Sequence, residues 1–194
     1  MMSSPDLFGS GPLQVFEDAE GGVRYRPGFV DPATAARWFA ALREGVAWRA
    51  QRRPMYDRVV DVPRLTAAYR LDADDLPAGL REAATLLRAE LGTPFNSVGL
   101  NFYRDERDSV APHGDKLHMI TPGHPIALLS LGSTRRMVIR AKPPARDARR
   151  IDLAPGSLLL MSHASQLTHD HGVPKQRAPA GERISLAFRV RPQP

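Results

Sequence analysis

The six histidines of this sequence all lie between positions 113 and 171. Histidine is the commonest nitrogen ligand of transition metals, so this half of the chain is the expected place for a metal. In the triplet His113-Gly114-Asp115, residues i and i+2 face the same way if the segment is extended, and the glycine allows close approach. A third, distant ligand would complete a two-histidine, one-carboxylate set with open positions, as in non-haem Fe(II) centres that activate O₂. A surface turn is the alternative interpretation.

The third ligand is expected at His171, in the segment THDHGVP, where Gly172 and Pro174 predict a turn. His169 is the alternative, because it lies two residues earlier and would share a face with His171 on an extended segment. The remaining histidines resemble loop residues: His118, His124 and His163. The chain contains no cysteine, so a disulfide or a metal held by thiolates is excluded.

The segment RISLAFRVR alternates between two kinds of residue, which predicts a strand with two different faces. The apolar face consists of Ile184, Leu186, Phe188 and Val190. The other face carries Arg183, Ser185, Ala187 and Arg189. Two arginines and a serine suit a cavity that holds a dianion, since an arginine fork binds a carboxylate through two bonds. Asn101 and Tyr103, also two residues apart, could add neutral donors from another strand. An edge strand with a wet face is the alternative.

Two helices and a series of short strands must position these residues. Asp31 followed by proline predicts a helix start, and Gly45 a plausible end. A second helix is expected after Asp74-Asp75 and stops at Gly92. Short strands are then expected at 98–103, 125–132, 136–140, 151–153, 156–161 and 183–191, with an Arg- and Pro-rich loop at 141–150. The order predicts an α+β domain whose second part is a sandwich or a distorted barrel.

The chain of 194 residues is long enough for one domain. Residues 1–22 are rich in Gly, Ser, Pro and acids, and we interpret them as a flexible leader that contains a short strand at Leu13–Phe16. Residues 23–194 then form a single domain. The N-terminus lacks the basic start and apolar core of a secretory signal, and no apolar run of about 18 residues exists for a transmembrane helix. The expected compartment is therefore the cytoplasm.

The chain carries 27 Lys and Arg against 21 Asp and Glu, and its pI is about 10.3. A basic domain suits a polyanion such as nucleic acid, although a GC-rich coding sequence would also enrich arginine. The segment Trp48–Arg70 interleaves six arginines with aromatic residues, a composition typical of nucleic-acid grooves. A loop and an edge strand with solvated arginines would give the same composition.

Five stretches, in order and spacing, resemble the AlkB family of 2-oxoglutarate- and Fe(II)-dependent dioxygenases: NFYRDERDSVAPHGD, IALLSLGSTRRMVIR, LAPGSLLLM, HDHGVPK and RISLAFR. The resemblance runs from about Val23 to Arg191. It implies a double-stranded β-helix (jelly-roll) core flanked by N-terminal helices. The implied Fe(II) ligands are His113, Asp115 and His171. The residues implied for 2-oxoglutarate are Asn101, Tyr103, Arg183, Ser185 and Arg189, with Arg183 at the distal carboxylate. No catalytic residue beyond the metal centre is implied.

The resemblance also implies an oxidative demethylase of N-alkylated nucleic-acid bases, which uses O₂ and releases formaldehyde, succinate and CO₂. Single strands are the expected substrates, because a base in a duplex must first be flipped out. Neither a membrane nor an obligate protein partner is expected. A nucleotide-recognition lid is expected at about 48–70, with four candidate substrate-binding residues: Met55, Tyr56, Arg64 and Tyr69. The alternatives are the same core acting on a modified RNA, a protein or a small molecule, and a non-catalytic module that binds nucleic acid.

The sequence departs from the family pattern in four places. The connection after VPRLTAAYR is shorter than in well-known repair members, which favours another substrate. Leu117 stands where some members carry an acid, His169 where an aromatic is common, and Ser185 where several have asparagine. None of these departures removes an implied iron ligand or Arg183.

Overall fold

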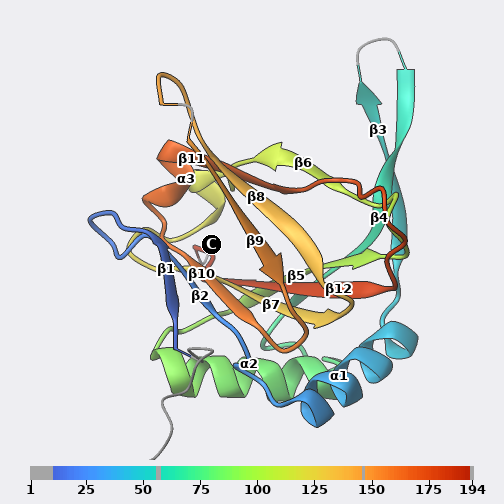
Figure 1. Ribbon diagram of the computed structural model, residues 1–194. Helices are drawn as coiled ribbons and strands as arrows, with labels where there is room; N and C mark the ends of the chain where they lie inside the picture. Colours follow the sequence, from blue (N-terminus) through green and yellow to red (C-terminus); the bar gives the residue numbers. More distant parts are fainter. Residues whose placement is uncertain (1–10, 56–57, 146, 193–194) are drawn as a thin grey trace, which may run out of the picture.

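Two antiparallel sheets and two long helices make up the computed structural model, which describes residues 11–55, 58–145 and 147–192 (Figure 1). The larger sheet has the order β1 (Leu13–Phe16), β2 (Val23–Arg26), β10 (Leu158–Met161), β7 (Ile126–Gly132), β12 (Arg183–Arg189), β5 (Ser97–Tyr103), β4 (Arg58–Arg70) and β3 (Arg49–Met55). The smaller sheet has the order β6 (Val110–His113), β11 (His169–Val173), β8 (Arg135–Ala141) and β9 (Ala148–Leu153). The prediction of an α+β domain with a jelly-roll core is confirmed.

The larger sheet separates two apolar cores. Helices α1 (Pro32–Gly45) and α2 (Ala78–Leu91) pack against one face, as Figure 1 shows below the sheets. The first core lies on this helix side and includes Ile184, Leu186 and Phe188. The second core lies on the other face, between the two sheets, and includes Tyr103 and Ala187. Alternate residues of β12 therefore face two different interiors, as the alternation predicted.

Both long helices have the predicted end signals. The Asp31 carboxylate accepts a hydrogen bond from the Thr34 backbone amide, 3.0 Å away, and the following proline is the first helical residue. Helix α2 begins at Ala78, three residues later than the aspartate pair, because Pro77 takes the cap position. It ends at Gly92, whose φ of 61° lies in the left-handed region that glycine adopts without strain.

Residues His169–Val173 of the segment THDHGVP form strand β11, so the turn predicted at Gly172 is wrong. Strand β11 pairs with β8 on one side and with β6 on the other. Gly172 serves close approach between strands: a Cβ there would lie 2.8 Å from the Val110 backbone oxygen. The predicted loop at 141–150 is also too long, because β9 begins at Ala148.

Within residues 11–22, which the sequence assigns to a leader, the strand expected at Leu13–Phe16 is present and extends the larger sheet. Strand β1 pairs with β2, and the chain then turns back at Asp18, whose carboxylate accepts from the backbone amides of Glu20 and Gly22. Residues 1–10 lie outside the described residues. No helix of the described part is long and apolar enough to cross a membrane.

Strands β3 and β4 form a long hairpin at the edge of the larger sheet, and Figure 1 shows it projecting beyond the other strands. Strand β4 pairs with β5 from Leu65 to Arg70. Along this stretch Leu65, Ala67 and Tyr69 pack against the helix-side core. Arg64 and Thr66, which alternate with these residues, line a groove on the other face. The hairpin thus places one face of β4 beside the space between the sheets.

Candidate metal and co-substrate site

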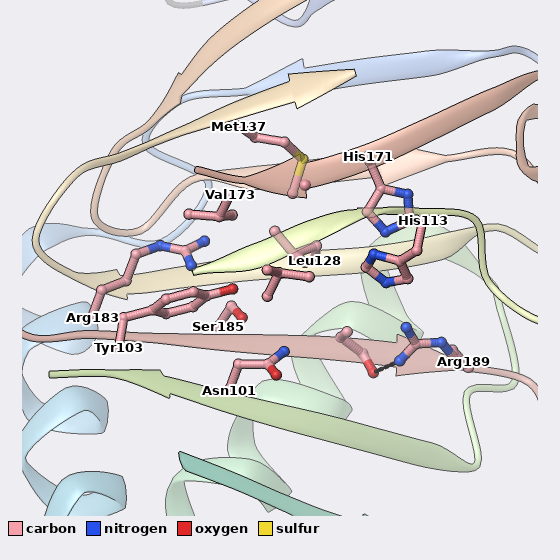
Figure 2. Close-up of a pocket in the computed structure, with 13 residues that line it drawn as sticks. Asn101, Tyr103, His113, Leu128, Met137, His171, Val173, Arg183, Ser185 and Arg189 are labelled. Carbon is pink, nitrogen blue, oxygen red and sulfur yellow. Dashed lines mark hydrogen bonds between the residues drawn. The ribbon is translucent and has the colours of Figure 1, made fainter. Parts of the chain in front are cut away.

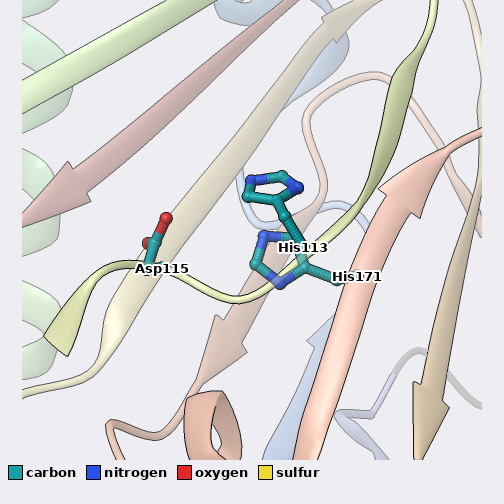
Figure 3. Close-up of side chains that lie close together, drawn as sticks. All are labelled: His113, Asp115 and His171. Carbon is teal, nitrogen blue, oxygen red and sulfur yellow. The ribbon is translucent and has the colours of Figure 1, made fainter. Parts of the chain in front are cut away.

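His113 and His171 come from neighbouring strands and lie directly opposite each other. Their backbones are in register between β6 and β11, and their ring centroids are 4.6 Å apart. Asp115 follows in the connection after β6. One ligand atom from each of the three side chains lies within 4.8 Å of the other two (Figure 3). The structure therefore brings together the three residues predicted to hold a metal.

Each imidazole has a ring nitrogen that can face a metal. The Nδ1 of His113 lies 2.9 Å from the Ala111 backbone oxygen. A carbonyl only accepts, so Nδ1 carries the proton and Nε2 is left for a metal, the usual arrangement of a ligating histidine. Burial, followed by the nearby His113, lowers the pKa of His171 to about 4. At pH 7 His171 is consequently neutral, as a metal ligand must be.

The Asp115 carboxylate is oriented by an arginine of β12. Arg189 donates from Nε to Oδ2 over 2.8 Å and from Nη2 to Oδ1 over 3.0 Å. Both side chains are largely buried, with exposed fractions of 17% for Arg189 and 13% for Asp115. This two-bond pair fixes the plane of the carboxylate beside the histidines. With two imidazoles and one carboxylate, the donor set suits a divalent transition metal such as Fe(II).

His169, the alternative third ligand, is occupied elsewhere. Its ring stacks on Phe16, with centroids 4.0 Å apart and planes inclined by 19°. Its Nδ1 lies 2.8 Å from the Thr168 hydroxyl. Among the described residues, the group that can share one metal contains His171 and not His169.

A cavity between the two sheets opens beside the triad (Figure 2). It is lined by polar residues of β5 and β12 and by apolar residues of the smaller sheet and β7: Asn101, Tyr103, Val110, His113, Leu128, Met137, His171, Gly172, Val173, Arg183, Ser185, Ala187 and Arg189. All five residues predicted to bind 2-oxoglutarate therefore line a single cavity that also contains both histidines.

Arg183 is a fully buried cation with unused hydrogen-bond donors. Its Nη2 donates to the Ser130 hydroxyl over 2.9 Å, whereas Nε and Nη1 are buried without a partner in the described structure. The Ser185 hydroxyl is likewise buried without a hydrogen-bond partner in the described structure. Burial lowers the pKa of Arg183, but a guanidinium keeps its charge at neutral pH. Unsatisfied buried donors on a charge are costly, and a carboxylate entering the cavity would satisfy them.

Among the described residues Arg135 is also fully buried, and it shows that a buried arginine of this protein need not lack hydrogen-bond partners. Arg135 donates to the Gln176 side chain and to three backbone carbonyls, so every one of its nitrogens has a partner. Arg183, by contrast, has one side-chain acceptor and the ring of Tyr103, whose centroid lies 5.0 Å from its Cζ. The geometry of Arg183 thus fits the distal carboxylate of 2-oxoglutarate.

A groove continues from the cavity to the surface below the β3–β4 hairpin. The two spaces share Asn101, His113, Ala187 and Arg189. Of the side chains that line the groove, four are cationic and one is acidic: Arg64, Lys116, Arg189 and Arg191, with Asp115. The groove therefore carries an excess of positive charge beside the metal triad.

The four candidate substrate-binding residues have different positions. Arg64 lines the groove, and its Nε donates to the Asn101 side-chain oxygen over 2.6 Å, which leaves the amide nitrogen of Asn101 as a donor. Tyr69 packs into the helix-side core and lines neither space. Tyr56 lies outside the described residues, and so does the side chain of Met55.

Several residues at the site were missed from the sequence. Ser130 is the acceptor for Arg183, and its signal was a single hydroxyl in the apolar run PIALLSLG. Leu128, Met137 and Val173 line the cavity but look like any core residue. Lys116 and Arg191 line the groove, and only the tertiary structure reveals that they share it.

Comparisons with known proteins agree with this geometry. The model of the 2OG-Fe(II) oxygenase superfamily matches residues 22–189. Alpha-ketoglutarate-dependent dioxygenase alkB homolog 3 of Rattus norvegicus is 35% identical over 87% of this chain and 64% of its own length, and the human protein of the same name is 34% identical over 87% and 66%. DNA oxidative demethylase ALKBH2 of Homo sapiens is 36% identical over 50% of this chain and 40% of its own. The chain thus spans about two thirds of the length of the alkB homolog 3 relatives, and the AlkB resemblance is confirmed.

Solved structures share the fold at low identity. OsALKBH1 superposes with a TM-score of 0.61 and 16% identity over 87% of this chain and 97% of that one. The non-heme alpha-ketoglutarate-dependent epimerase SnoN superposes with a TM-score of 0.58 and 15% identity, over 87% of this chain and 78% of that one.

Proposed function

Because the chain belongs to the 2OG-Fe(II) oxygenase superfamily, we propose that it is a 2-oxoglutarate-dependent Fe(II) dioxygenase that demethylates N-alkylated nucleic-acid bases. The observation that carries the proposal is the basic groove, which leads from the surface to His113 and Asp115. The names of the relatives, among them a DNA oxidative demethylase, support the same substrate class.

The chain's own residues have separate tasks in this proposal. His113, Asp115 and His171 hold Fe(II), while Arg183, Ser130 and Ser185 receive the distal carboxylate of 2-oxoglutarate. The apolar side chains of the cavity exclude water from the co-substrate. Fe(II), 2-oxoglutarate and O₂ supply the oxidation of an N-methyl carbon, which leaves as formaldehyde, with succinate and CO₂ as the other products.

The β3–β4 hairpin is the proposed substrate lid, because it borders the groove through Gln51, Arg64 and Thr66. Single strands are the proposed substrates, since a single-stranded base reaches the triad without the cost of leaving a duplex. The proposed compartment is the cytoplasm, and no protein partner is part of the proposal.

Turnover on a methylated single strand tests the proposal. The protein is reconstituted with Fe(II) and 2-oxoglutarate without oxygen, O₂ is added, and succinate and formaldehyde are followed with single-stranded DNA carrying 1-methyladenine or 3-methylcytosine. We expect one formaldehyde for each succinate, and only with the methylated strand. Succinate without formaldehyde would contradict base demethylation and favour a different substrate for the same core, which the short connection between β4 and α2 also favours. Strand binding without any succinate would favour the non-catalytic module.

Lys116 and Arg191 are expected to bind phosphates of the strand. Both line the groove, and both residues are exposed. Replacing both with alanine should weaken single-strand binding and reduce the slope of log affinity against log salt by roughly 1.4, about 0.7 for each lost phosphate contact. Fluorescence anisotropy at several salt concentrations measures this slope.

The matched control removes the same charge from another surface. Lys175 and Arg177 line a separate hollow that shares no residue with the groove. Replacing these two with alanine should leave the slope nearly unchanged. Equal changes in the two double variants would mean that net charge, and not the groove, governs binding.

A further inference from the structure

Asp115 differs from the two histidines in how its backbone is held. Both histidines belong to paired strands, whereas residues 114–116 lie between the end of β6 and the 3-10 turn Leu117–Met119. Arg189 fixes the carboxylate, and its remaining side-chain nitrogen, Nη1, donates to the Ala187 backbone oxygen. The backbone amide of Asp115 donates to Oε1 of Gln166, 3.0 Å away on the one-turn helix α3 (Ser165–Thr168).

Gln166 is buried and its amide group is fixed in one orientation. Its exposed fraction is 3%. The Nε2 atom donates to the Ser165 hydroxyl over 3.0 Å and to the Ser162 backbone oxygen over 3.5 Å. With the nitrogen committed in this way, the oxygen must face Asp115. A buried amide whose two ends both have partners holds its neighbours firmly in place.

The contact between α3 and the metal-ligand connection is also tight at the backbone. A Cβ at Gly114 would lie 2.9 Å from the Gln166 backbone oxygen and 3.3 Å from Lys142 Nζ. The same Lys142 Nζ donates to that oxygen over 2.7 Å. The glycine between the two predicted ligands therefore allows α3 to approach, as well as allowing the ligands to converge.

A four-residue helix is not stable alone, and residues 16–20 hold both of its ends. At the start, Glu20 accepts from the Ala164 backbone amide over 2.8 Å, and Asp18 accepts from the Ser162 hydroxyl, which itself accepts from the Ser165 amide. At the end, Phe16 stacks on His169. The three residues that support α3 are thus spaced two apart along the chain: Phe16, Asp18 and Glu20.

We propose that Gln166 is a positioning residue for the metal ligand Asp115, and that residues 16–20 act through it by holding α3. The segment that reads as a leader would then be a support of the metal centre. This inference rests on the proposed metal centre and adds a residue that contacts neither the metal nor the substrate.

Metal affinity tests the inference without turnover. The probe is Co(II), titrated into the metal-free protein and followed by its visible absorption. Gln166→Met keeps the volume and removes the acceptor, and we expect its dissociation constant for Co(II) to rise about 10-fold or more, as when other supports of metal ligands are removed. Gln166→Glu restores an acceptor for the Asp115 amide and should recover much of the affinity. Gln176→Met is the matched control, since Gln176 bonds Arg135 and lies outside the α3 network, and it should bind Co(II) like the wild type.

The outcomes separate the inference from its premise. Circular dichroism and the melting temperature show whether each variant is folded. Wild-type Co(II) affinity in a folded Gln166→Met variant would overturn the positioning role while leaving the metal centre intact. Equal Co(II) binding by the wild type and His171→Ala would overturn the metal centre, and the inference with it.

The role of residues 16–20 has its own test, which also serves if Gln166→Met does not fold. Asp18→Ala should raise the Co(II) dissociation constant by about 3-fold and speed exchange of the Asp115 backbone amide with solvent. Where Gln166→Met folds, adding Asp18→Ala to it should raise the dissociation constant little further, because the two changes interrupt one path. Unchanged Co(II) affinity and unchanged amide exchange in Asp18→Ala would overturn the role of this segment.

Discussion

Replacing Asp115 with alanine is expected to abolish 2-oxoglutarate-dependent turnover while the protein stays folded. The residue lies in a connection and supports no core, so its loss removes a ligand and the partner of Arg189 but no packing. Removing a residue that merely supports a ligand costs roughly 10- to 100-fold in metal affinity, so loss of the ligand itself should cost more than about 100-fold. Anaerobic Fe(II) titration and succinate formation measure the two losses, and circular dichroism verifies the fold.

The matched comparison lies within one strand. His171→Ala should lose iron as Asp115→Ala does, whereas His169→Ala should retain it. The two histidines belong to the same strand two positions apart, but His169 is stacked on Phe16 and His171 faces His113. Iron binding retained by His171→Ala and lost by His169→Ala would reverse the assignment of the third ligand. Wild-type turnover by Asp115→Ala would contradict the metal centre altogether.

Local alternation predicted those parts of the site that lie on strands with two different faces. On β12 the apolar residues face the helices and the polar ones face the cavity, so a period of two was enough to select Arg183, Ser185 and Arg189. On β5 the same rule selected Asn101 and Tyr103. The helix ends were predictable for a similar reason, since Asp31 and Gly92 act through local geometry alone.

Features that depend on distant partners were not predictable in this way. Gly172 carries a turn signal in the sequence, but its role is to let β11 approach β6. Residues 11–22 look like a polar leader because their partners, Ser162 and Ala164, are more than 140 positions away. Tyr69 fits an aromatic nucleic-acid contact by composition, yet its position on β4 turns it to the helix-side core. In each case the sequence shows the residue type, and the tertiary neighbours determine its use.

Replacing Arg183 with alanine is expected to raise the 2-oxoglutarate requirement by at least about 100-fold and to change the maximal rate much less. Truncating one partner of a buried, hydrogen-bonded charge pair costs about 2 to 5 kcal/mol, and about 3 kcal/mol corresponds to somewhat more than 100-fold in affinity. The expected contact is with the carboxylate remote from the metal, so its loss should weaken binding equally in the ground and transition states. Initial rates of succinate formation against 2-oxoglutarate concentration separate KM from kcat.

Arg183 is an unusual buried arginine to remove, because its Nε and Nη1 have no protein partner in the described structure. Its replacement should therefore cost the folded state little, while the rise in melting temperature that 2-oxoglutarate gives the wild type should disappear. Arg183→Lys keeps the charge without the fork and should recover only part of the affinity. Arg136→Ala, which removes an exposed arginine paired with Asp152, is the control and should leave KM unchanged. An unchanged KM in Arg183→Ala would instead mean that the buried charge serves the fold, and that the co-substrate binds elsewhere.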